Sequence, residues 1–363
     1  MIRPPLFLRS LALGSLALLA ACGHSGGGAP GAEAPKKDFT IGWSIYAGWM
    51  PWPYAQEAGI VKKWADKYGI TIKLVQVNDY VESVNQYTAG KLDGVVATSM
   101  DTLTIPAAGG KDTSVVILGD YSDGNDGVVL KNAHSLADIK GRPVNLVELS
   151  VSQYLLARGL EKAGMKLSDV KIVNTSDADI VGAFASPQVN AVVTWNPQLS
   201  EVKKAPGASL VFDSSQIPNE ILDVMAVSSA TLKANPALGK ALAGIWYETM
   251  ALMQKNDAAG RAARAQMAHD AGTTPDAYDA QLKTTHLYYG AADAVRLAKS
   301  GELVTVTDRV RRFSFARGLF GPSATSVDSI GIGFANGKTL GDAANVKLRF
   351  DPTYMQMAAD GKL

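Results

Sequence analysis

Tryptophan and tyrosine side chains gather where two predicted strands of this 363-residue chain end. The set consists of Trp43, Tyr46, Trp49 and Trp52 around the first strand, and Trp195 after a later one. The face of an aromatic ring attracts a compact cation through a cation–π interaction. These residues therefore indicate a binding site for a small cation, although Trp49 and Trp52 could instead pack between a helix and a sheet.

Acidic residues follow predicted strand ends in the same way. The set consists of Asp101 with Ser99 beside it, Asp120, Asp123, Asp126, Glu148 and Asp223. A carboxylate forms charge-assisted hydrogen bonds with a cationic donor, so acidic and aromatic groups together suit a compact planar cation. Structural roles compete with this one: Asp101 could cap the next helix, and Asp123 and Asp126 sit beside glycines, as turn residues do.

Ten of these residues are our candidates for ligand binding. They are Trp43, Tyr46, Trp49, Trp52, Ser99, Asp101, Asp123, Glu148, Trp195 and Asp223. Asp223 lies where the chain should pass between domains, so a structural role at a hinge competes with ligand binding. The 4 histidines are scattered along the sequence, and we expect no metal site, no cofactor and no catalytic residue.

The elements that must position these side chains alternate along the chain. Strands are predicted over residues 39–45, 70–77, 94–97 and 115–118, with helices over residues 53–68 and 80–89. The pattern restarts after Gly127, with strands over residues 143–147, 170–173, 191–194 and 211–212 and helices over residues 152–163 and 177–185. Such alternation predicts two α/β units, each a parallel sheet covered by helices on both faces.

The second unit is predicted to be inserted in the first. An apolar segment over residues 222–227 returns the chain, and helices are expected over residues 236–255, 258–271, 275–283 and 291–299, with an irregular remainder that has only weak helical stretches. The expected parts are residues 38–122 (lobe I, first part), 123–222 (lobe II) and 223–363 (lobe I, second part, mainly helical). The chain would cross between lobes near residues 120–128 and 218–227. Ligands bind at the carboxyl ends of strands in such sheets, so the cleft between the lobes is the expected site.

The amino terminus predicts export and a lipid anchor. Arg3 and Arg9 flank an apolar run that is shorter than the ~20 residues needed to span a bilayer, so residues 1–21 are expected to be a signal peptide. The run ends in Leu-Ala-Ala-Cys22, which resembles the bacterial lipobox, whose cysteine carries a diacylglycerol. Residues 22–37 are rich in Gly, Ala and Pro and predict a flexible tether.

Composition excludes several classes of function. Cys22 is the single cysteine, so disulfides, iron–sulfur clusters and cysteine-based metal sites are excluded. The formal net charge is +1, and loss of Arg3 and Arg9 with the signal peptide brings it to about −1. A nearly neutral chain offers no concentrated basic face for nucleic acid.

Four segments of the sequence carry a likeness to a known family. They are GWMPWPYAQEAG at residues 48–59 with IVKK at 60–63, YTAGKLDG at 87–94, SLADIKG at 135–141 and VTWNP at 193–197. In this order they resemble the nitrate/sulfonate/taurine and thiamine-precursor binding proteins over residues 39 to about 253. The resemblance implies an α/β, type II periplasmic-binding-protein fold, with two lobes around a ligand cleft and two hinge crossings. It also implies a receptor, not an enzyme, that delivers a small molecule to an ABC permease and its ATPase.

A narrower resemblance concerns the ligand. The aromatic opening and the segments TSMDT (98–102) and SDGND (122–126) resemble a subgroup associated with urea-carboxylase gene regions, whose ligand is thought to be urea or guanidine. Anion-binding members hold a sulfonate at uncovered helix N-termini, whereas Asp101 and Glu148 should stand near those termini here and repel an anion.

We therefore expect guanidinium or a related amidine or amine as the ligand, with urea next. The alternatives are a small anion (taurine, alkyl sulfonate or nitrate) and a pyrimidine thiamine precursor. The protein is expected to be a monomer of the periplasm or cell envelope, anchored to a membrane through the Cys22 lipid.

Overall fold

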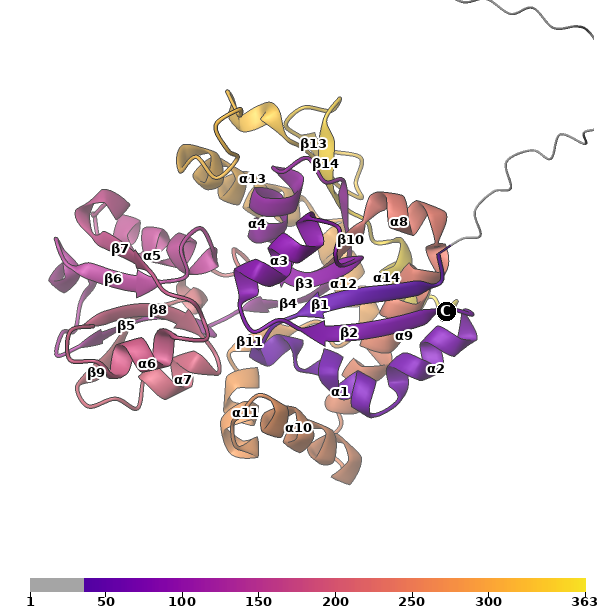
Figure 1. Cartoon of the computed structure of the whole chain (residues 1–363), viewed down its shortest axis with the longest axis horizontal. Helices are drawn as coiled ribbons and strands as arrows, with labels where there is room; N and C mark the ends of the chain where they lie inside the picture. The colour runs from indigo at the N-terminus through magenta and orange to yellow at the C-terminus, as the bar shows by residue number, and fades with distance from the viewer. Residues whose placement is uncertain (1–35) are drawn as a thin grey trace, which may run out of the picture. The chain divides into compact units, whose positions relative to one another are not determined.

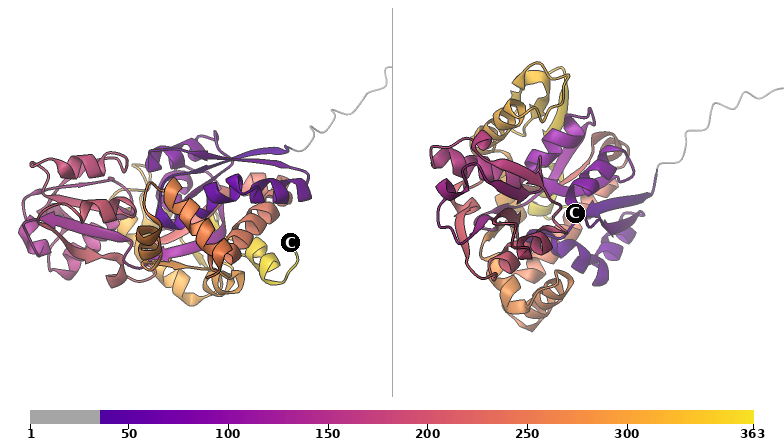
Figure 2. Two further views of the ribbon diagram at one scale, coloured as in Figure 1. Left: turned by 90° about the horizontal axis from the view of Figure 1, so that it is seen from below. Right: turned by 60° about the vertical axis from the view of Figure 1, so that its left-hand side comes forward.

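The computed structural model describes residues 36–363, and Lys36–Leu363 form one unit. The expected signal peptide (residues 1–21), the lipid-carrying Cys22 and the tether up to residue 35 lie outside the described residues. Two sheets flanked by helices make up the fold (Figure 1, Figure 2). The part built on the 9-stranded sheet is called the larger lobe below, and the part built on the 5-stranded sheet the smaller lobe.

The larger sheet has the strand order β13-β12-β14-β4-β10-β3-β1-β2, with β11 paired to β4. Its strands are β1 (Asp38–Trp43), β2 (Thr71–Gln76), β3 (Gly94–Thr98), β4 (Thr113–Ser122), β10 (Leu222–Ser228), β11 (Thr285–Leu287), β12 (Gly331–Gly333), β13 (Thr339–Leu340) and β14 (Val346–Phe350). β1 pairs in parallel with β2 and β3, as the alternating pattern predicts. β10 runs antiparallel to β3 and β4, so the returning chain makes the sheet mixed.

Most helices belong to the larger lobe. They are α1 (Pro51–Glu57), α2 (Ile60–Lys67), α3 (Tyr80–Thr88), α4 (Ser99–Thr102), α8 (Ser229–Ala234), α9 (Pro236–Met253), α10 (Ala258–Asp270), α11 (Pro275–Leu282), α12 (Ala291–Ala298), α13 (Gly301–Ala316) and α14 (Thr353–Ala359). The single helix expected over residues 53–68 is divided into α1 and α2. Gly59 separates them with a φ of 76°, a conformation that glycine adopts at little cost and that interrupts a helix.

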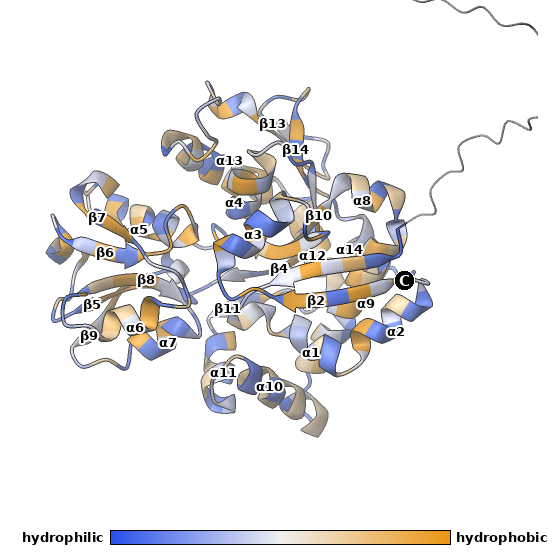
Figure 3. Cartoon of the chain, in the orientation of Figure 1, coloured by the Kyte–Doolittle hydropathy of each residue, from blue (hydrophilic) through white to orange (hydrophobic). Residues whose placement is uncertain are grey.

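The smaller sheet has the order β7-β6-β8-β5-β9. Its strands are β5 (Asp126–Lys131), β6 (Pro143–Leu146), β7 (Lys171–Asn174), β8 (Ala191–Trp195) and β9 (Ala208–Asp213), flanked by α5 (Val151–Lys162), α6 (Ile180–Ala185) and α7 (Gln198–Val202). β6 is parallel to β7 and β8, whereas β5 is antiparallel to β8 and β9. Every residue of β8 is buried, and the strand is coloured mainly hydrophobic in Figure 3.

The two passages between the sheets lie side by side. The chain leaves the larger sheet at Ser122 and enters the smaller one at Asp126, then returns between Asp213 and Leu222. The hydroxyl oxygens of Ser122 and Ser214 are 2.6 Å apart, and the Ser122 amide donates to the Ile221 carbonyl at 3.0 Å. The lobes are therefore joined by a narrow pair of hydrogen-bonded crossings.

The chain beyond residue 300 is not irregular, so that expectation is wrong. α13 begins after Ser300, whose side chain accepts a hydrogen bond from the Leu303 amide, and β12, β13 and β14 extend the larger sheet. The β-branched run at residues 304–307 lowers the helix propensity of α13. Tertiary contacts compensate, since the buried Arg311 pairs with Asp308 and Asp328 at 2.6 Å each.

Apolar burial holds each lobe together. Trp52 of α1 stacks on Trp246 of α9 in the larger lobe, with ring centroids 5.1 Å apart, and Val129, Phe184 and Val192 pack together in the smaller lobe. None of the helices between residues 36 and 363 combines the length and apolar character that crossing a membrane requires.

Candidate ligand-binding site

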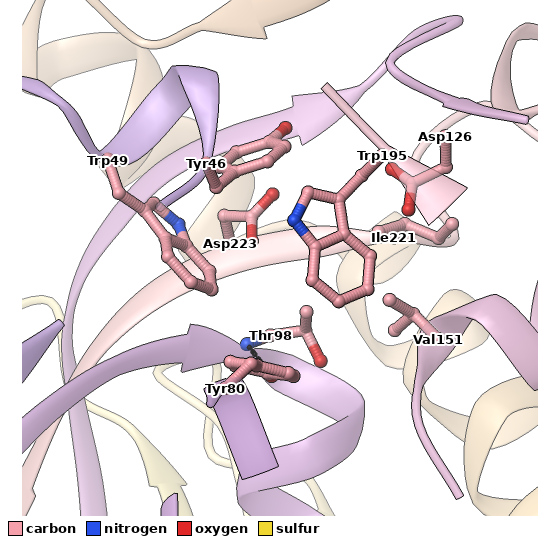
Figure 4. A pocket seen from close by; sticks show the side chains of 9 residues that line it. All are labelled: Tyr46, Trp49, Tyr80, Thr98, Asp126, Val151, Trp195, Ile221 and Asp223. Carbon is pink, nitrogen blue, oxygen red and sulfur yellow. Dashed lines mark hydrogen bonds between the residues drawn. The ribbon is translucent and has the colours of Figure 1, made fainter. Parts of the chain in front are cut away.

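A small cavity lies between the two lobes, beside the crossings. Its 9 lining residues are Tyr46, Trp49, Tyr80, Thr98 and Asp223 from the larger lobe, Asp126, Val151 and Trp195 from the smaller lobe, and Ile221 from the second crossing (Figure 4). The cavity volume is about 10 Å³, about the volume of one water-sized sphere. Whatever binds here without widening the cavity must be very small.

Four aromatic rings surround this space in a continuous chain. The ring centroids of Tyr46 and Trp49 are 5.1 Å apart at an interplanar angle of 62°. Trp49 and Tyr80 follow at 5.5 Å and 43°, and Tyr80 meets Trp195 edge to face at 5.8 Å and 77°. Aromatic pairs favour such edge-to-face geometry. The rings therefore form a preorganised apolar wall with faces and edges turned toward a shared centre, as Figure 4 shows.

Two carboxyl groups face the cavity from opposite lobes. Asp126 begins β5, and its carboxyl accepts a hydrogen bond from the Ser122 hydroxyl at 2.5 Å. Burial raises the pKa of Asp126 to about 7 against the lowering effect of that bond. Asp223 lies in β10 and is 3% exposed. Burial and then the charges of Asp120 and Asp126 raise the pKa of Asp223 well above its ordinary value. The cavity is thus lined by two acids, and burial disfavours the ionised form of both.

Asp101 supports the wall from behind without lining the cavity. Its carboxyl accepts hydrogen bonds from the Tyr80 hydroxyl at 2.6 Å and the Thr98 hydroxyl at 2.8 Å. Burial raises the pKa of Asp101 to about 6, while these two bonds lower it. Asp101 does not cap α4. The Thr98 side chain is the N-cap of this helix and accepts a hydrogen bond from the Asp101 amide. Asp101 therefore fixes the orientation of two cavity residues.

The other candidates lie outside the cavity. Trp43 is buried in the core of the larger lobe. Ser99 is half-buried in the first turn of α4, and Asp123 is half-buried in a turn, where its amide donates to the Thr284 carbonyl at 3.0 Å. Glu148 is exposed after β6. Of the ten candidates, the fold brings Tyr46, Trp49, Trp195 and Asp223 together at the cavity wall.

Trp52 lines a second small space behind this wall. It is lined by Trp49, Trp52, Val96, Ile117, Gly119, Asp120, Asp223, Val224, Met225 and Trp246, and its volume is also about 10 Å³. Trp49 and Asp223 border both spaces. Asp120 is fully buried here, with one carboxyl oxygen 3.1 Å from the donating Tyr46 hydroxyl.

Five lining residues were not among the candidates. They are Tyr80, Thr98, Asp126, Val151 and Ile221. Asp126 carried a signal, since it stands with the other acids at the first crossing, but its neighbouring glycine favoured a turn. Tyr80 begins α3, where nothing in the local pattern separates a wall residue from a core residue. Val151 and Ile221 are ordinary apolar residues and carry no sequence signal.

The lobes contact each other around the cavity through backbone and side-chain hydrogen bonds. The Trp195 indole donates to the Ile45 carbonyl at 3.3 Å, and the Ala47 amide donates to the Asn196 carbonyl at 3.2 Å. The Tyr80 amide donates to the carboxyl of Asp177 at 3.2 Å. The site residues of the larger lobe are thus held directly by the smaller lobe.

Within residues 36–363, no group of three or more His, Cys, Asp or Glu side chains has an arrangement that could hold a metal ion. The cavity wall has two acids, Asp126 and Asp223, together with four aromatic residues.

Comparison with known proteins places the chain in a family. A model of the family described as NMT1/THI5 like matches residues 54–256, more than half of the chain. The chain belongs to the NMT1/THI5-like family. The matched region runs from α1 to α9, so it contains the whole smaller lobe and both crossings.

Relatives of this NMT1/THI5-like chain are similar over part of their length. A binding protein of Brucella abortus (strain 2308) is 31% identical over 135 residues, which cover 36% of this chain and 41% of that protein. An aliphatic sulfonates-binding protein of Escherichia coli (strain K12) is 31% identical over 83 residues, which cover 23% of this chain and 26% of that protein. Both matches span less than half of the relative.

Solved structures of similar fold extend the comparison. The alkanesulfonate-binding protein SsuA of Xanthomonas axonopodis pv. citri, bound to MOPS, has a TM-score of 0.65 at 17% identity, over 80% of this chain and 96% of that chain. The likeness confirms the periplasmic-binding-protein fold that the four segments of the sequence implied.

Proposed function

We propose that this protein is an extracytoplasmic solute-binding protein of an ABC importer, and that its ligand is a small planar nitrogen cation such as guanidinium. The cavity wall carries the proposal. Asp126 of the smaller lobe and Asp223 of the larger lobe face the same space among aromatic rings, and none of the described lining residues is a lysine or an arginine. A cation between the two carboxyl groups would join the lobes.

The wall matches guanidinium in both shape and charge. The flat faces of the cation can lie against the rings of Trp49 and Trp195, where the ring quadrupole attracts positive charge. Its N–H groups point outward in the plane, toward carboxylates that accept charge-assisted hydrogen bonds. The positive charge of the ligand would also favour the ionised carboxylates, which offsets the desolvation that raises the pKa of Asp126 and Asp223.

The small volume of the cavity favours the smallest of the candidate ligands. A volume of about 10 Å³ leaves little room beyond one water-sized molecule. Guanidinium and urea are among the smallest planar nitrogen compounds and would need only a slight widening of this space, whereas taurine or a pyrimidine ring would need the lobes to separate further. Urea is therefore the second choice, since it fits equally well but gains less from the carboxyl groups.

A small anion is the alternative that the names of the relatives favour. An anion in this cavity would lie beside Asp126 and Asp223 and would need both to be protonated. Three helices begin at cavity residues, α3 at Tyr80, α4 after Thr98 and α5 at Val151. Each already has one amide engaged by a side chain, at 2.8 Å in α3 and at 3.1 Å in α4 and α5. Sulfonate or nitrate binding would consequently strengthen as the pH falls, the opposite of the cation case.

The same proposal covers the partners and the place of the protein. It acts as a monomeric receptor, not as an enzyme, and the described lining residues include neither His, Cys, Ser nor Lys. The receptor delivers its ligand to an ABC permease and its ATPase. It is held at the periplasmic or cell-envelope face of a membrane by the lipid on Cys22.

Binding should close the lobes about the two crossings. The moving parts are residues 38–122 and 223–363 on one side and residues 123–222 on the other. Small-angle scattering with saturating guanidinium should give a smaller radius of gyration than the ligand-free protein, and mass spectrometry should recover the ligand unchanged. Turnover of a bound compound would contradict the receptor proposal.

Calorimetry with guanidinium, urea and taurine on the purified protein tests the ligand class. We expect tightest binding of guanidinium, weaker binding of urea and none of taurine. In a thermal-shift assay, guanidinium at ~100 times its Kd should add about 2.7 kcal/mol to the free energy of unfolding. Tight taurine binding without guanidinium binding would overturn the cation proposal and favour the anion alternative.

A further inference from the structure

Asp120 and Asp223 face each other directly on neighbouring antiparallel strands. They are register partners of β4 and β10, and their exposed fractions are 0% and 3%. Like charges at directly opposed sheet positions repel each other. Two ionised carboxylates in this place would be costly, so the pair needs a proton or a cation between its members.

One oxygen of each carboxyl group is available for that role. Asp120 Oδ2 and Asp223 Oδ2 are buried, and no donor among the described residues supplies either with a hydrogen bond. The other Asp120 oxygen accepts from the Tyr46 hydroxyl at 3.1 Å. Asp223 lines the ligand cavity, whereas Asp120 lies one layer behind it, beside Trp49.

The titratable and charged groups around the pair leave it short of positive charge. They are Tyr46 after β1, Asp126 of β5, Tyr278 of α11, Tyr288 and Tyr289 after β11, and, acting on two of these tyrosines, Arg264 of α10. On the outer sides of the pair, Thr98 of β3 is the register partner of Asp223 and Leu287 of β11 is that of Asp120, and neither residue carries a charge. His286 of β11 is exposed and stacks on Tyr121 at 4.4 Å.

Loss of contact with water also favours the protonated form of both aspartates. Burial is the largest cause that raises the pKa of both acids, and the charge of Asp120 raises that of Asp223 further. Asp223, which can share a hydrogen bond with Asp120 once one of the two is protonated, and the Tyr46 hydroxyl lower the pKa of Asp120 in part. The pair therefore keeps a proton under conditions in which an exposed aspartate has lost it.

We propose that Asp120 is a specificity-determining residue, because it shares with Asp223 a proton that a cationic ligand displaces and a neutral ligand leaves in place. The inference rests on the proposed function and adds to it a means of distinguishing a cationic ligand from a neutral one. Guanidinium enters beside Asp223, the shared proton leaves to solvent, and the positive charge of the ligand replaces that of the proton. Urea brings no charge, so the proton stays.

Proton counting by calorimetry tests the exchange. Guanidinium chloride, at concentrations far below those that denature proteins, is titrated at about pH 7 in phosphate and in Tris, whose heats of ionisation differ. We expect the pair to release about one proton per guanidinium, in addition to any proton that Asp126 gives up, and urea to release none. Through linkage, the guanidinium affinity should rise up to ~10-fold per pH unit for each proton released between about pH 6 and pH 8, while the urea affinity stays flat.

Asp120→Asn keeps the shape of the side chain and removes the carboxyl group. At each pH it should release up to about one proton fewer per guanidinium than the wild type, with a flatter pH dependence of affinity, because any proton lost by Asp126 is common to both proteins. Asp66→Asn, which changes an exposed acid of α2, should behave as the wild type. Guanidinium binding by the wild type without proton release would overturn the exchange and leave the proposed function standing. Absence of guanidinium binding at every pH would instead overturn the proposed function.

Carbon-13 NMR of labelled aspartate gives a readout that does not depend on the variant. The ligand-free wild type at about pH 7 should show a protonated carboxyl signal that guanidinium chloride removes and urea does not. If every aspartate is ionised in the ligand-free protein, the shared proton does not exist and the inference fails.

Discussion

Asp126 and Trp195 are register partners at the ends of β5 and β8, so the carboxyl group and the indole enter the cavity from directly opposed positions. Side chains at such positions share one face of the sheet and lie close together. The smaller lobe thus contributes an adjacent carboxyl group and indole to the cavity. The larger lobe contributes Asp223 and three aromatic rings.

Asp126→Asn should weaken guanidinium binding by roughly 10-fold to 150-fold. A charge-assisted hydrogen bond is worth ~1.5–3 kcal/mol, and each ~1.4 kcal/mol is a factor of ten in Kd. Calorimetry measures the change. Asp123→Asn is the matched control, because Asp123 lies on the same crossing but outside the cavity. Equal losses in both variants would contradict a direct contact with Asp126.

Trp195→Leu should weaken guanidinium binding by a few-fold to about 30-fold, since the cation–π contribution is ~0.5–2 kcal/mol. Trp195→Phe retains a ring face and should lose less. Trp64→Leu is the control, because the Trp64 indole donates to Glu248 at 2.7 Å and does not line the cavity. If Trp195→Phe and Trp195→Leu bind guanidinium equally, ring stacking at this position is not part of recognition.

Glu220→Gln should destabilise the protein by about 3 kcal/mol, because removing one partner of a buried ion pair leaves the others uncompensated. The Glu220 carboxyl is 3% exposed beside the second crossing, and it accepts from Arg158 of α5 at 2.8 Å and from Arg309 of α13. Thermal unfolding, which adds neither candidate ligand, gives the change in free energy. Glu161→Gln removes the exposed partner of the same Arg158 and should cost only ~0–1 kcal/mol. Equal costs would mean that burial of Glu220 contributes nothing.

The ligand-free protein should lose stability as the pH rises from about 4 to about 7. Burial raises the pKa of Asp101 to about 6 and that of Asp126 to about 7. The folded state then binds more protons than the unfolded state in this window, so these acids favour folding fully only below their unfolded pKa. Thermal unfolding across the window should show a falling Tm, and saturating guanidinium should reduce the slope. A Tm that rises steadily up to pH 7 would contradict this prediction.

Cys22→Ser should abolish lipid labelling and move the protein out of the detergent phase. Cys22 is the only cysteine of the chain, so no second thiol can take its place. Metabolic labelling with a fatty acid and detergent partitioning measure the change. Continued membrane fractionation of the variant in cells without the permease would contradict the lipid anchor.

The local pattern of the sequence was enough to predict that Tyr46, Trp49, Trp195 and Asp223 lie close together, and all four line one cavity. Each follows or lies in a predicted strand near a predicted crossing, and strand ends of α/β units converge at one edge of a sheet. The same pattern predicted most strands and helices up to residue 299, but it missed the strands β5 and β11 and the short helices α4, α7 and α8. It failed beyond residue 300, where the packing of Arg311 and the pairing of β14 with β4 outweigh weak local preferences.

Other features depend on contacts between distant segments, which no local pattern contains. Asp126 and Asp123 have similar neighbours in the sequence, yet one is buried in β5 and the other remains in the turn. Glu148, expected at the site, is exposed one residue before Leu149, whose φ of 67° marks a sharp change in chain direction. Residue type predicted an acidic and aromatic site, but not which acids would reach it.

The opposition of Asp120 and Asp223 was decided by tertiary structure alone. The sequence places one acid on each of two strands, and either could be a hinge or turn residue when read by itself. The register of β4 against β10, with its irregular step beside Asp223, sets them face to face. Burial then turns two ordinary aspartates into a pair that must hold a proton or a cation, because the free energy of a buried charge depends on what lies opposite it.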